Sequence, residues 1–178
     1  MKKGVTLIEL AVVMAIIGIM ALFMVPAIGQ WIDSYRIKQA AREMVSDMQL
    51  AKMKAMGNSR YCTVTFNINV GGTDYSYIVY DDSDSDCEYD AGEEIYERMI
   101  LGNEYKHVGF DTTQGGGDGL TFVDNDNNQP TVAFDARGLP RNNTGGFGAG
   151  TAFLKHSKNN KGRQVIVSAA GRVRIHEY

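Results

Sequence analysis

The sequence GVTLIELAVVMAIIGIMALFMVPAIGQWI, residues 4–32, decides how the chain begins to fold. Its only charged residue is Glu9, and 23 consecutive residues from Leu10 to Ile32 carry no charge. A helix of that length, rising 1.5 Å per residue, spans the hydrocarbon core of a bilayer, about 30 Å. An unpaired carboxylate deep in lipid costs roughly 2.5 kcal/mol or more. We therefore expect Glu9 to have a partner that satisfies its charge.

The residues before this segment form a second signal. Lys2 and Lys3 precede Gly4, and residues 5–9 read VTLIE. This pattern resembles the N-terminal signal of type IV pilins and type II secretion pseudopilins, in which a short basic leader ends in Gly. The resemblance implies that a prepilin peptidase/N-methyltransferase cleaves between Gly4 and Val5 and methylates Val5. It also implies that Glu9, fifth in the mature chain, pairs with a neighbouring subunit's N-terminus. Many members have Phe where this chain has Val5.

A secretory signal peptide and an ordinary membrane anchor both fit the segment less well. The apolar core of a secretory signal peptide is shorter, and an ordinary anchor leaves Glu9 and the Gly4 junction unexplained. Lys2 and Lys3 place the N-terminus in the cytoplasm by the positive-inside rule. We therefore expect a single-pass protein of the bacterial inner membrane, with a periplasmic head, that later enters a pilus or pseudopilus.

The apolar pattern narrows to one helical face after residue 30. Apolar residues recur at spacings of four and three, which indicates a half-buried helix: Ile37, Ala41, Met44, Met48, Ala51 and Ala55. Charged residues occupy opposing positions: Lys38, Arg42, Asp47, Lys52 and Lys54. Pro26 should kink the helix, and Gly57-Asn58 should end it. The expected segments are a leader (1–4), a transmembrane and assembly helix (5–30), an amphipathic helix (31–57) and a head (58–178).

The head is predicted to be antiparallel and β-rich. Residues 61–68 alternate, 71–74 form a turn and 75–80 supply the partner strand of a hairpin. Further strands are expected near residues 94–100, 107–110, 120–123, 131–135, 151–155, 163–168 and 172–176. The predicted fold class is α+β: a long N-terminal helix, transmembrane in its first half, packed on a β-rich globular head.

The C-terminal third narrows the resemblance. VAFDARGLP (132–140), RQVIVS (163–168) and GRVRI (171–175) resemble the minor pilins and pseudopilins of the GspH/FimT family. The resemblance implies a pilin-like fold and a structural subunit with a specialised head near the filament tip. Its partners would be other pilins or pseudopilins, the prepilin peptidase and the inner membrane. In FimT-like members a Gly-Arg-x-Arg motif is associated with DNA binding in natural transformation, which carries over to Arg172 and Arg174 alone.

Charge is unevenly distributed along the chain. Residues 61–130 contain 2 Lys/Arg and 15 Asp/Glu, whereas residues 131–178 contain 8 and 2. Such segregation favours separate acidic and basic surfaces, or two regions that neutralise each other within one domain. Arg172 and Arg174 share one face of a predicted strand, where two guanidinium groups suit phosphate oxygens. Pairing of these arginines with the acidic region inside the head is the alternative.

An acidic loop is the candidate metal site. Its acidic residues occupy relative positions 1, 3, 5, 7, 9 and 12, as in a calcium-binding EF-hand loop: Asp82, Asp84, Asp86, Glu88, Asp90 and Glu93. Cys87 replaces the Gly of the sharp turn, and a strand instead of a helix precedes the loop. A solvated acidic loop without calcium is the alternative, and no other cofactor is expected.

The two cysteines could form a disulfide or remain thiols. A Cys62–Cys87 disulfide is permissible outside the cytoplasm and would contribute roughly 3 kcal/mol. Two unpaired thiols are the alternative.

Motifs that would indicate an enzyme are missing. The sequence contains no zinc motif, no phosphate-binding loop and no recognisable nucleophile with its base. We therefore expect a structural subunit instead of an enzyme, with a membrane-anchored calcium-binding module unrelated to filaments as the remaining alternative.

Overall fold

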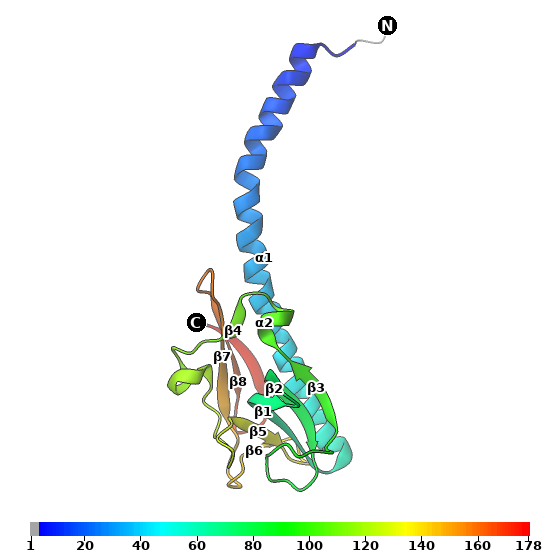
Figure 1. The fold of residues 1–178 in the computed structure, drawn as a ribbon, viewed down its shortest axis with the longest axis vertical. Helices are drawn as coiled ribbons and strands as arrows, with labels where there is room; N and C mark the ends of the chain where they lie inside the picture. Colours follow the sequence, from blue (N-terminus) through cyan, green and yellow to red (C-terminus); the bar gives the residue numbers. More distant parts are fainter. Residues whose placement is uncertain (1–3) are drawn as a thin grey trace.

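One long helix leads into a β-rich head (Figure 1). The computed structural model describes residues 4–178, except for the side chains of residues 23–28. Helix α1, Leu7–Asn58, is 52 residues long. Pro26 is one of the residues whose side chains are not described, so the kink expected there stays a prediction. Within the described part of the chain, no helix combines the length and the apolar character needed to cross a membrane.

The second half of α1 confirms the predicted apolar stripe. Its six members are all buried, with at most 1% of each residue exposed. The helix ends at Asn58, as the Gly57-Asn58 stop predicted. Ser59 adopts the left-handed conformation, with φ of 54°, and its backbone N–H donates to the Ala55 carbonyl. The helix therefore ends on a left-handed cap directly after the predicted Gly57-Asn58 stop.

The first sheet is built on the predicted hairpin. Strands β1 (Tyr61–Val70) and β2 (Thr73–Asp82) pair in register from Tyr61–Asp82 to Val70–Thr73. Gly71 and Gly72 both have positive φ, as a two-residue type I′ turn requires. Strands β3 (Ile95–Met99), β5 (Thr131–Phe134) and β6 (Pro140–Arg141) complete the order β3-β2-β1-β5-β6.

The second sheet contains the C-terminal strands in the order β4-β7-β8-β9. Its members are β4 (Val108–Phe110), β7 (Gly150–His156), β8 (Gly162–Val167) and β9 (Val173–Glu177), all antiparallel to their neighbours. A short helix, α2 (Leu101–Glu104), precedes β4. Strand β9 pairs only with β8 and forms one edge of this sheet.

The strand expected at residues 120–123 is wrong. Leu120 makes an isolated bridge to Ala152 of the second sheet, and Asp124 bridges Pro130 beside the first sheet. The chain passes from one sheet to the other here, so it cannot form a ladder with either. A glycine turn, Gly115–Gly119, directs it into this crossing.

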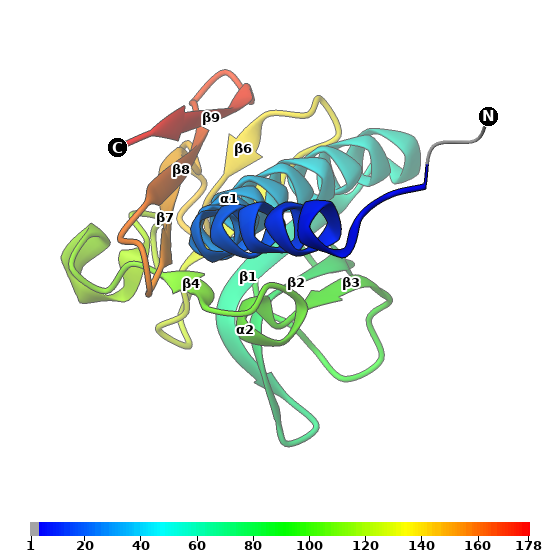
Figure 2. The same ribbon diagram turned by 90° about the horizontal axis from the view of Figure 1, so that it is seen from above.

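The main core lies between α1 and the two sheets (Figure 2). The α1 stripe packs on side chains of both sheets, including Phe66, Phe134, Leu154 and Val165. A smaller cluster of Ile68, Ile78 and Tyr80 includes the partly buried Tyr89 of the loop after β2. This loop therefore covers part of the first sheet away from α1.

Candidate functional site

The start of α1 is a capping box formed by Thr6 and Glu9. The Thr6 backbone N–H and hydroxyl donate to Glu9 Oε2 at 2.8 and 2.7 Å, and the Glu9 N–H donates to Thr6 Oγ1 at 3.3 Å. The Thr-x-x-Glu spacing favours this arrangement because it satisfies two free N–H groups of the first turn. Within the described chain, Glu9 Oε1 has no hydrogen-bond donor, so one carboxylate oxygen is available to a group from outside.

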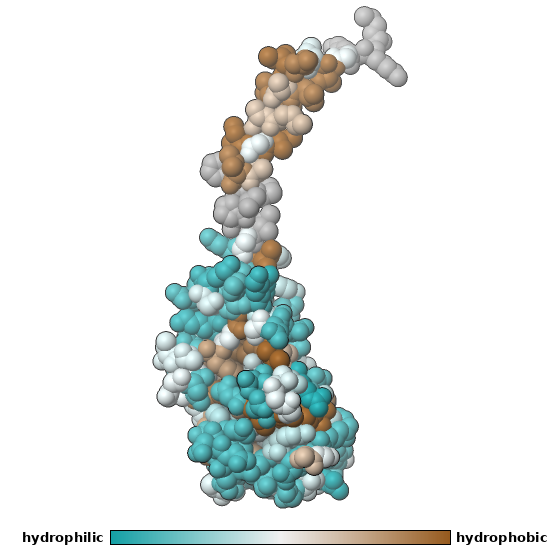
Figure 3. All heavy atoms as spheres, viewed as in Figure 1, coloured by the Kyte–Doolittle hydropathy of each residue, from teal (hydrophilic) through white to brown (hydrophobic). Residues whose placement is uncertain are grey.

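The first half of α1 presents its apolar side chains to its surroundings. Every residue from Gly4 to Leu22 is exposed, including Leu7 at 86% and Leu22 at 75%. This apolar part of the helix stands clear of the largely hydrophilic head (Figure 3). A contiguous apolar surface of this kind indicates contact with lipid or with other apolar chains.

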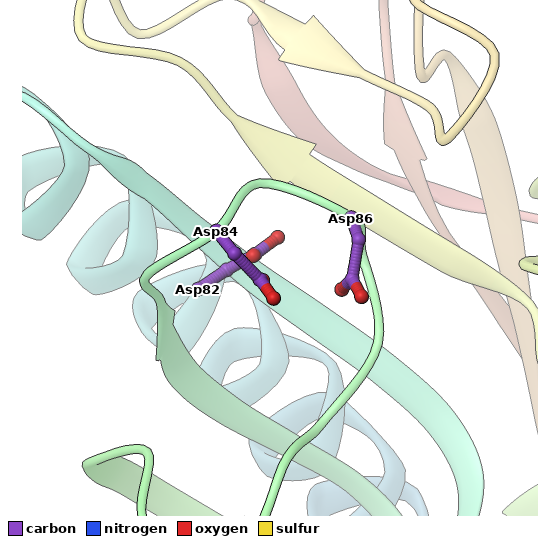
Figure 4. Close-up of side chains that lie close together, drawn as sticks. All are labelled: Asp82, Asp84 and Asp86. Atoms are coloured by element: carbon purple, nitrogen blue, oxygen red, sulfur yellow. The ribbon is translucent and has the colours of Figure 1, made fainter.

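The structure brings together three of the six candidate calcium ligands. One carboxylate oxygen from each of Asp82, Asp84 and Asp86 lies within 4.8 Å of the others, and the three side chains gather within the curve of the loop (Figure 4). Asp82 is fully buried and accepts from Thr63 Oγ1 at 2.8 Å and from the Ser85 and Cys87 N–H groups at 2.8 and 3.0 Å. Burial raises the pKa of Asp82 to about 6, although these three hydrogen bonds oppose the rise.

The other three candidates do not join this cluster. Glu93 accepts from the Ser83 N–H at 2.8 Å and from the Asp90 N–H at 3.1 Å. Glu88 accepts from Asn127 Nδ2 at 2.7 Å. The loop is therefore closed by its own hydrogen bonds and does not have the EF-hand arrangement, in which the residue at position 12 is a bidentate ligand. Calcium binding at the remaining three aspartates stays a prediction.

Cys62 and Cys87 are free and buried in this structure, which agrees with the alternative of two unpaired thiols and not with a disulfide. Cys62 belongs to the core under α1. The Cys87 backbone N–H donates to the Asp82 carboxylate, which also accepts from the Thr63 hydroxyl. Thr63 is the neighbour of Cys62 on β1 and points to the other face of the sheet. Because successive residues of a strand point to opposite faces, the sheet separates the two cysteines. Burial raises the pKa of each thiol to about 12, which makes both unreactive.

Arg172 lies directly before the edge strand β9, and Arg174 lies on the outward face of that strand. Both are exposed, whereas Val173 between them packs on the core. The turn before them is fixed by Gly171, whose N–H donates to the Ser168 carbonyl at 2.8 Å and whose carbonyl accepts from Lys52 Nζ at 3.0 Å. Among the described residues neither guanidinium group has an ion-pair partner. The alternative that they pair with the acidic loop is therefore not supported.

Two polar contacts between α1 and the head were not foreseen. The Tyr77 hydroxyl donates to Asp47 Oδ2 at 2.7 Å, and the Tyr105 hydroxyl donates to Glu43. Burial raises the pKa of Asp47 to about 6, with Glu97 and Glu43 adding to the rise and the Tyr77 hydrogen bond opposing it. The sequence placed Asp47 on the exposed side of the helix. Asp47 directly precedes the buried Met48, and only this position could have indicated that its side chain contacts the head.

Comparisons with known proteins agree with these features. The family described as type II transport protein GspH matches residues 40–171, and the prokaryotic N-terminal methylation motif matches residues 1–25. Pilin-like protein PilA1 of Thermus thermophilus is 25% identical over 175 residues, covering 98% of each chain. The crystal structure of the type IV minor pilin FimU of Pseudomonas aeruginosa is similar with a TM-score of 0.42 and 16% identity, over 78% of this chain and 91% of that one.

The family match covers α1 from residue 40 onward and nearly all of the head. The methylation motif covers the Gly4 junction and Glu9. The chain therefore belongs to the GspH family, and it is a minor pilin or pseudopilin of the type IV pilus and type II secretion class, a structural subunit and not an enzyme.

Proposed function

We propose that this subunit enters a type II secretion pseudopilus or a type IV pilus through α1, with its specialised head near the filament tip. The observation that carries the proposal is the exposed apolar surface of Gly4–Leu22, which contains a single carboxylate, Glu9. Equivalent helices of neighbouring subunits can cover such a surface by apolar packing. The amphipathic half of α1 is already covered by the head, so the assembly contact falls on the first half.

Before assembly, the same surface requires lipid. In our proposal residues 5–30 then lie in the bacterial inner membrane, with the N-terminus in the cytoplasm and the head in the periplasm. The match to the N-terminal methylation motif supports cleavage after Gly4 and methylation of Val5. Cleavage creates a cationic amino group at Val5, next to the only carboxylate of the segment.

Glu9 sets the register of the filament in this mechanism. Its Oε2 is held by Thr6, and its Oε1 faces outward without an intrachain donor in the described chain. The amino group of a neighbouring subunit's N-terminus can bind this oxygen. The pair would offset the cost of removing both charges from water, provided that its geometry is good. Because the segment has only one carboxylate, only one axial position of the neighbour satisfies it.

The test compares Glu9→Ala with Thr6→Ala in cells that assemble the filament. Both substitutions break the capping box, but only Glu9→Ala removes the charge. We expect Glu9→Ala to remain in the membrane fraction and to be lost from sheared filaments. Thr6→Ala should be incorporated. Normal incorporation of Glu9→Ala, or equal loss of both variants, would contradict the role of the carboxylate.

DNA uptake is a second candidate function, favoured by the exposure of Arg172 and Arg174 without partners in the described chain. Residues two apart on a strand lie about 6.8 Å from one another, so both guanidinium groups can contact one nucleic acid backbone. Binding through phosphates weakens as salt increases, by about one counterion per contact.

Duplex DNA binding by the full chain in neutral detergent, measured across a salt series, tests this function. The Arg172→Ala/Arg174→Ala double variant should bind more weakly and lower the salt slope by about 2. Lys38→Ala/Arg42→Ala, which removes two charges of α1, is the matched control. Absence of binding at low salt, or an equal effect of both double variants, would reject DNA capture through β9.

A further inference from the structure

The end of the head from which α1 emerges is built from three segments. They are the α1 turn around Asp33 and Ser34, the loop between β7 and β8, and the loop between α2 and β4 (Figure 1). Lys161 Nζ donates to Ser34 Oγ at 2.8 Å, and the Ser157 N–H donates to the His107 carbonyl at 2.9 Å. These contacts fix both loops around the base of the protruding helix.

Basic side chains predominate on this surface. We name four of them the basic collar: Arg36, Lys106, Lys158 and Lys161. The three lysines are exposed. Of the nearby acidic groups, Asp33 is paired with Arg36 at 3.2 Å, which leaves Glu104. Partial burial, followed by the charges of Lys158 and Lys106, lowers the pKa of His107, which agrees with a concentration of positive charge at this point.

Aromatic side chains occupy the helix directly beside the collar. Trp31 and Tyr35 stack with their ring centroids 5.8 Å apart, and they are 68% and 47% exposed. They follow the apolar segment, where the chain would leave the hydrocarbon. Tryptophan and tyrosine favour this depth because one part of the ring is apolar and another forms hydrogen bonds.

We propose that the basic collar docks the head onto an anionic phospholipid surface while Trp31 and Tyr35 lie among the headgroups. The inference rests on the proposed membrane location of the preceding helix. Trp31 and Asp33 are about 3 Å apart along the helix axis. Lys161 of the collar contacts Ser34, the next residue along the helix, so this part of the collar comes within about one Debye length, 8 Å, of the headgroups. Each lysine near an anionic surface should raise the docked-to-undocked ratio about fivefold.

The test places the full chain in vesicles and measures the distance of the head from the lipid. A donor dye attached through Ser157→Cys reports energy transfer to an acceptor lipid, and the buried Cys62 and Cys87 do not compete for the label. Trp31 is the only tryptophan of the chain, so its fluorescence reports membrane insertion independently. Vesicles of phosphatidylglycerol are compared with vesicles of phosphatidylcholine.

Transfer should be stronger with phosphatidylglycerol and fall to the neutral-lipid value near about 500 mM salt. Lys106→Ala/Lys158→Ala should lower the docked-to-undocked ratio about 25-fold. The Arg172→Ala/Arg174→Ala control should leave it unchanged. Equal energy transfer with both lipids, or an equal fall of the ratio in both double variants, overturns the docking. The basic collar would then be a contact site for another protein. Failure of the chain to insert into either vesicle overturns the membrane location as well, whereas filament entry is judged separately by Glu9→Ala.

Discussion

Replacement of Asp47 by Asn should stabilise the head at neutral pH. Asp47 accepts one hydrogen bond from Tyr77, and an Asn side-chain oxygen can accept the same bond. The substitution removes a partly buried charge that lies near Glu97 and Glu43. The expected gain arises because the desolvation of the carboxylate and its repulsion by like charges disappear, while the contact between α1 and β2 is kept.

The size of the effect follows from the pKa of Asp47. A rise from 3.8 to about 6 corresponds to at most about 3 kcal/mol. Because solvent still reaches this carboxyl group, we expect about 1 to 2 kcal/mol. A raised pKa means that the folded state binds the proton more tightly than the unfolded state. The associated stability is complete below about pH 4 and is lost as the pH rises through about 6.

Thermal unfolding of the full chain in neutral detergent, followed by circular dichroism, measures this difference. At about pH 7.5, Asp47→Asn should raise Tm by about 3 to 6 °C, and near pH 4 the two proteins should be nearly equal. Asp124→Asn makes the same chemical change at an exposed position and should have little effect at either pH. A lower Tm for Asp47→Asn at about pH 7.5, or an offset that does not change with pH, would refute the reasoning.

Three further outcomes are expected. Met48→Ala should lower the free energy of unfolding, measured in urea, by about 2 to 5 kcal/mol. Met53→Ala, at an exposed site, should change it little. Similar losses in the two variants would contradict the packing of α1. A reducing agent should leave Tm unchanged, and both thiols should react with maleimide only after unfolding; a native mass two hydrogens lower would instead reveal a bridge. Calcium affinity, measured by titration calorimetry, should depend on Asp84 and hardly on Glu93, whose carboxylate is used within the loop; the reverse order would restore an EF-hand mode.

Local patterns predicted the helix and most strands. The apolar stripe from Ile37 to Ala55 is confirmed. It could be predicted because a spacing of three and four residues depends only on the geometry of a single helix. The hairpin over residues 61–80 is confirmed for a similar reason, since two glycines between alternating strands define its turn. The prediction of a strand at 120–123 was wrong. Its residues are apolar enough for a strand, but the partners of this segment lie on two different sheets.

The candidate sites show a similar division. Thr6 and Glu9 are three residues apart, and their capping box was open to prediction from local spacing. Arg172 and Arg174 were both expected on a strand, but β9 begins at Val173 and contains only Arg174. Only the structure shows that both arginines are exposed and that β9 is an edge. The acidic loop had EF-hand spacing, yet the carboxylates of Glu88 and Glu93 accept hydrogen bonds from other parts of the head or loop.

The N-terminal signal, the long helix with its two halves, and the β-rich character of the head can all be predicted from the amino-acid sequence alone. These features depend on residues a few positions apart, whose contacts are set by helical and strand periods. The contacts that join distant segments could be seen only in the folded chain: Thr63 with Asp82, Asp47 with Tyr77, and Lys52 with Gly171. The fold likewise placed Cys62 and Cys87 on opposite faces of one sheet. Such pairs depend on how the strands, the loops and α1 pack together, and a shift of one residue in strand register would turn every side chain of a strand to the other face.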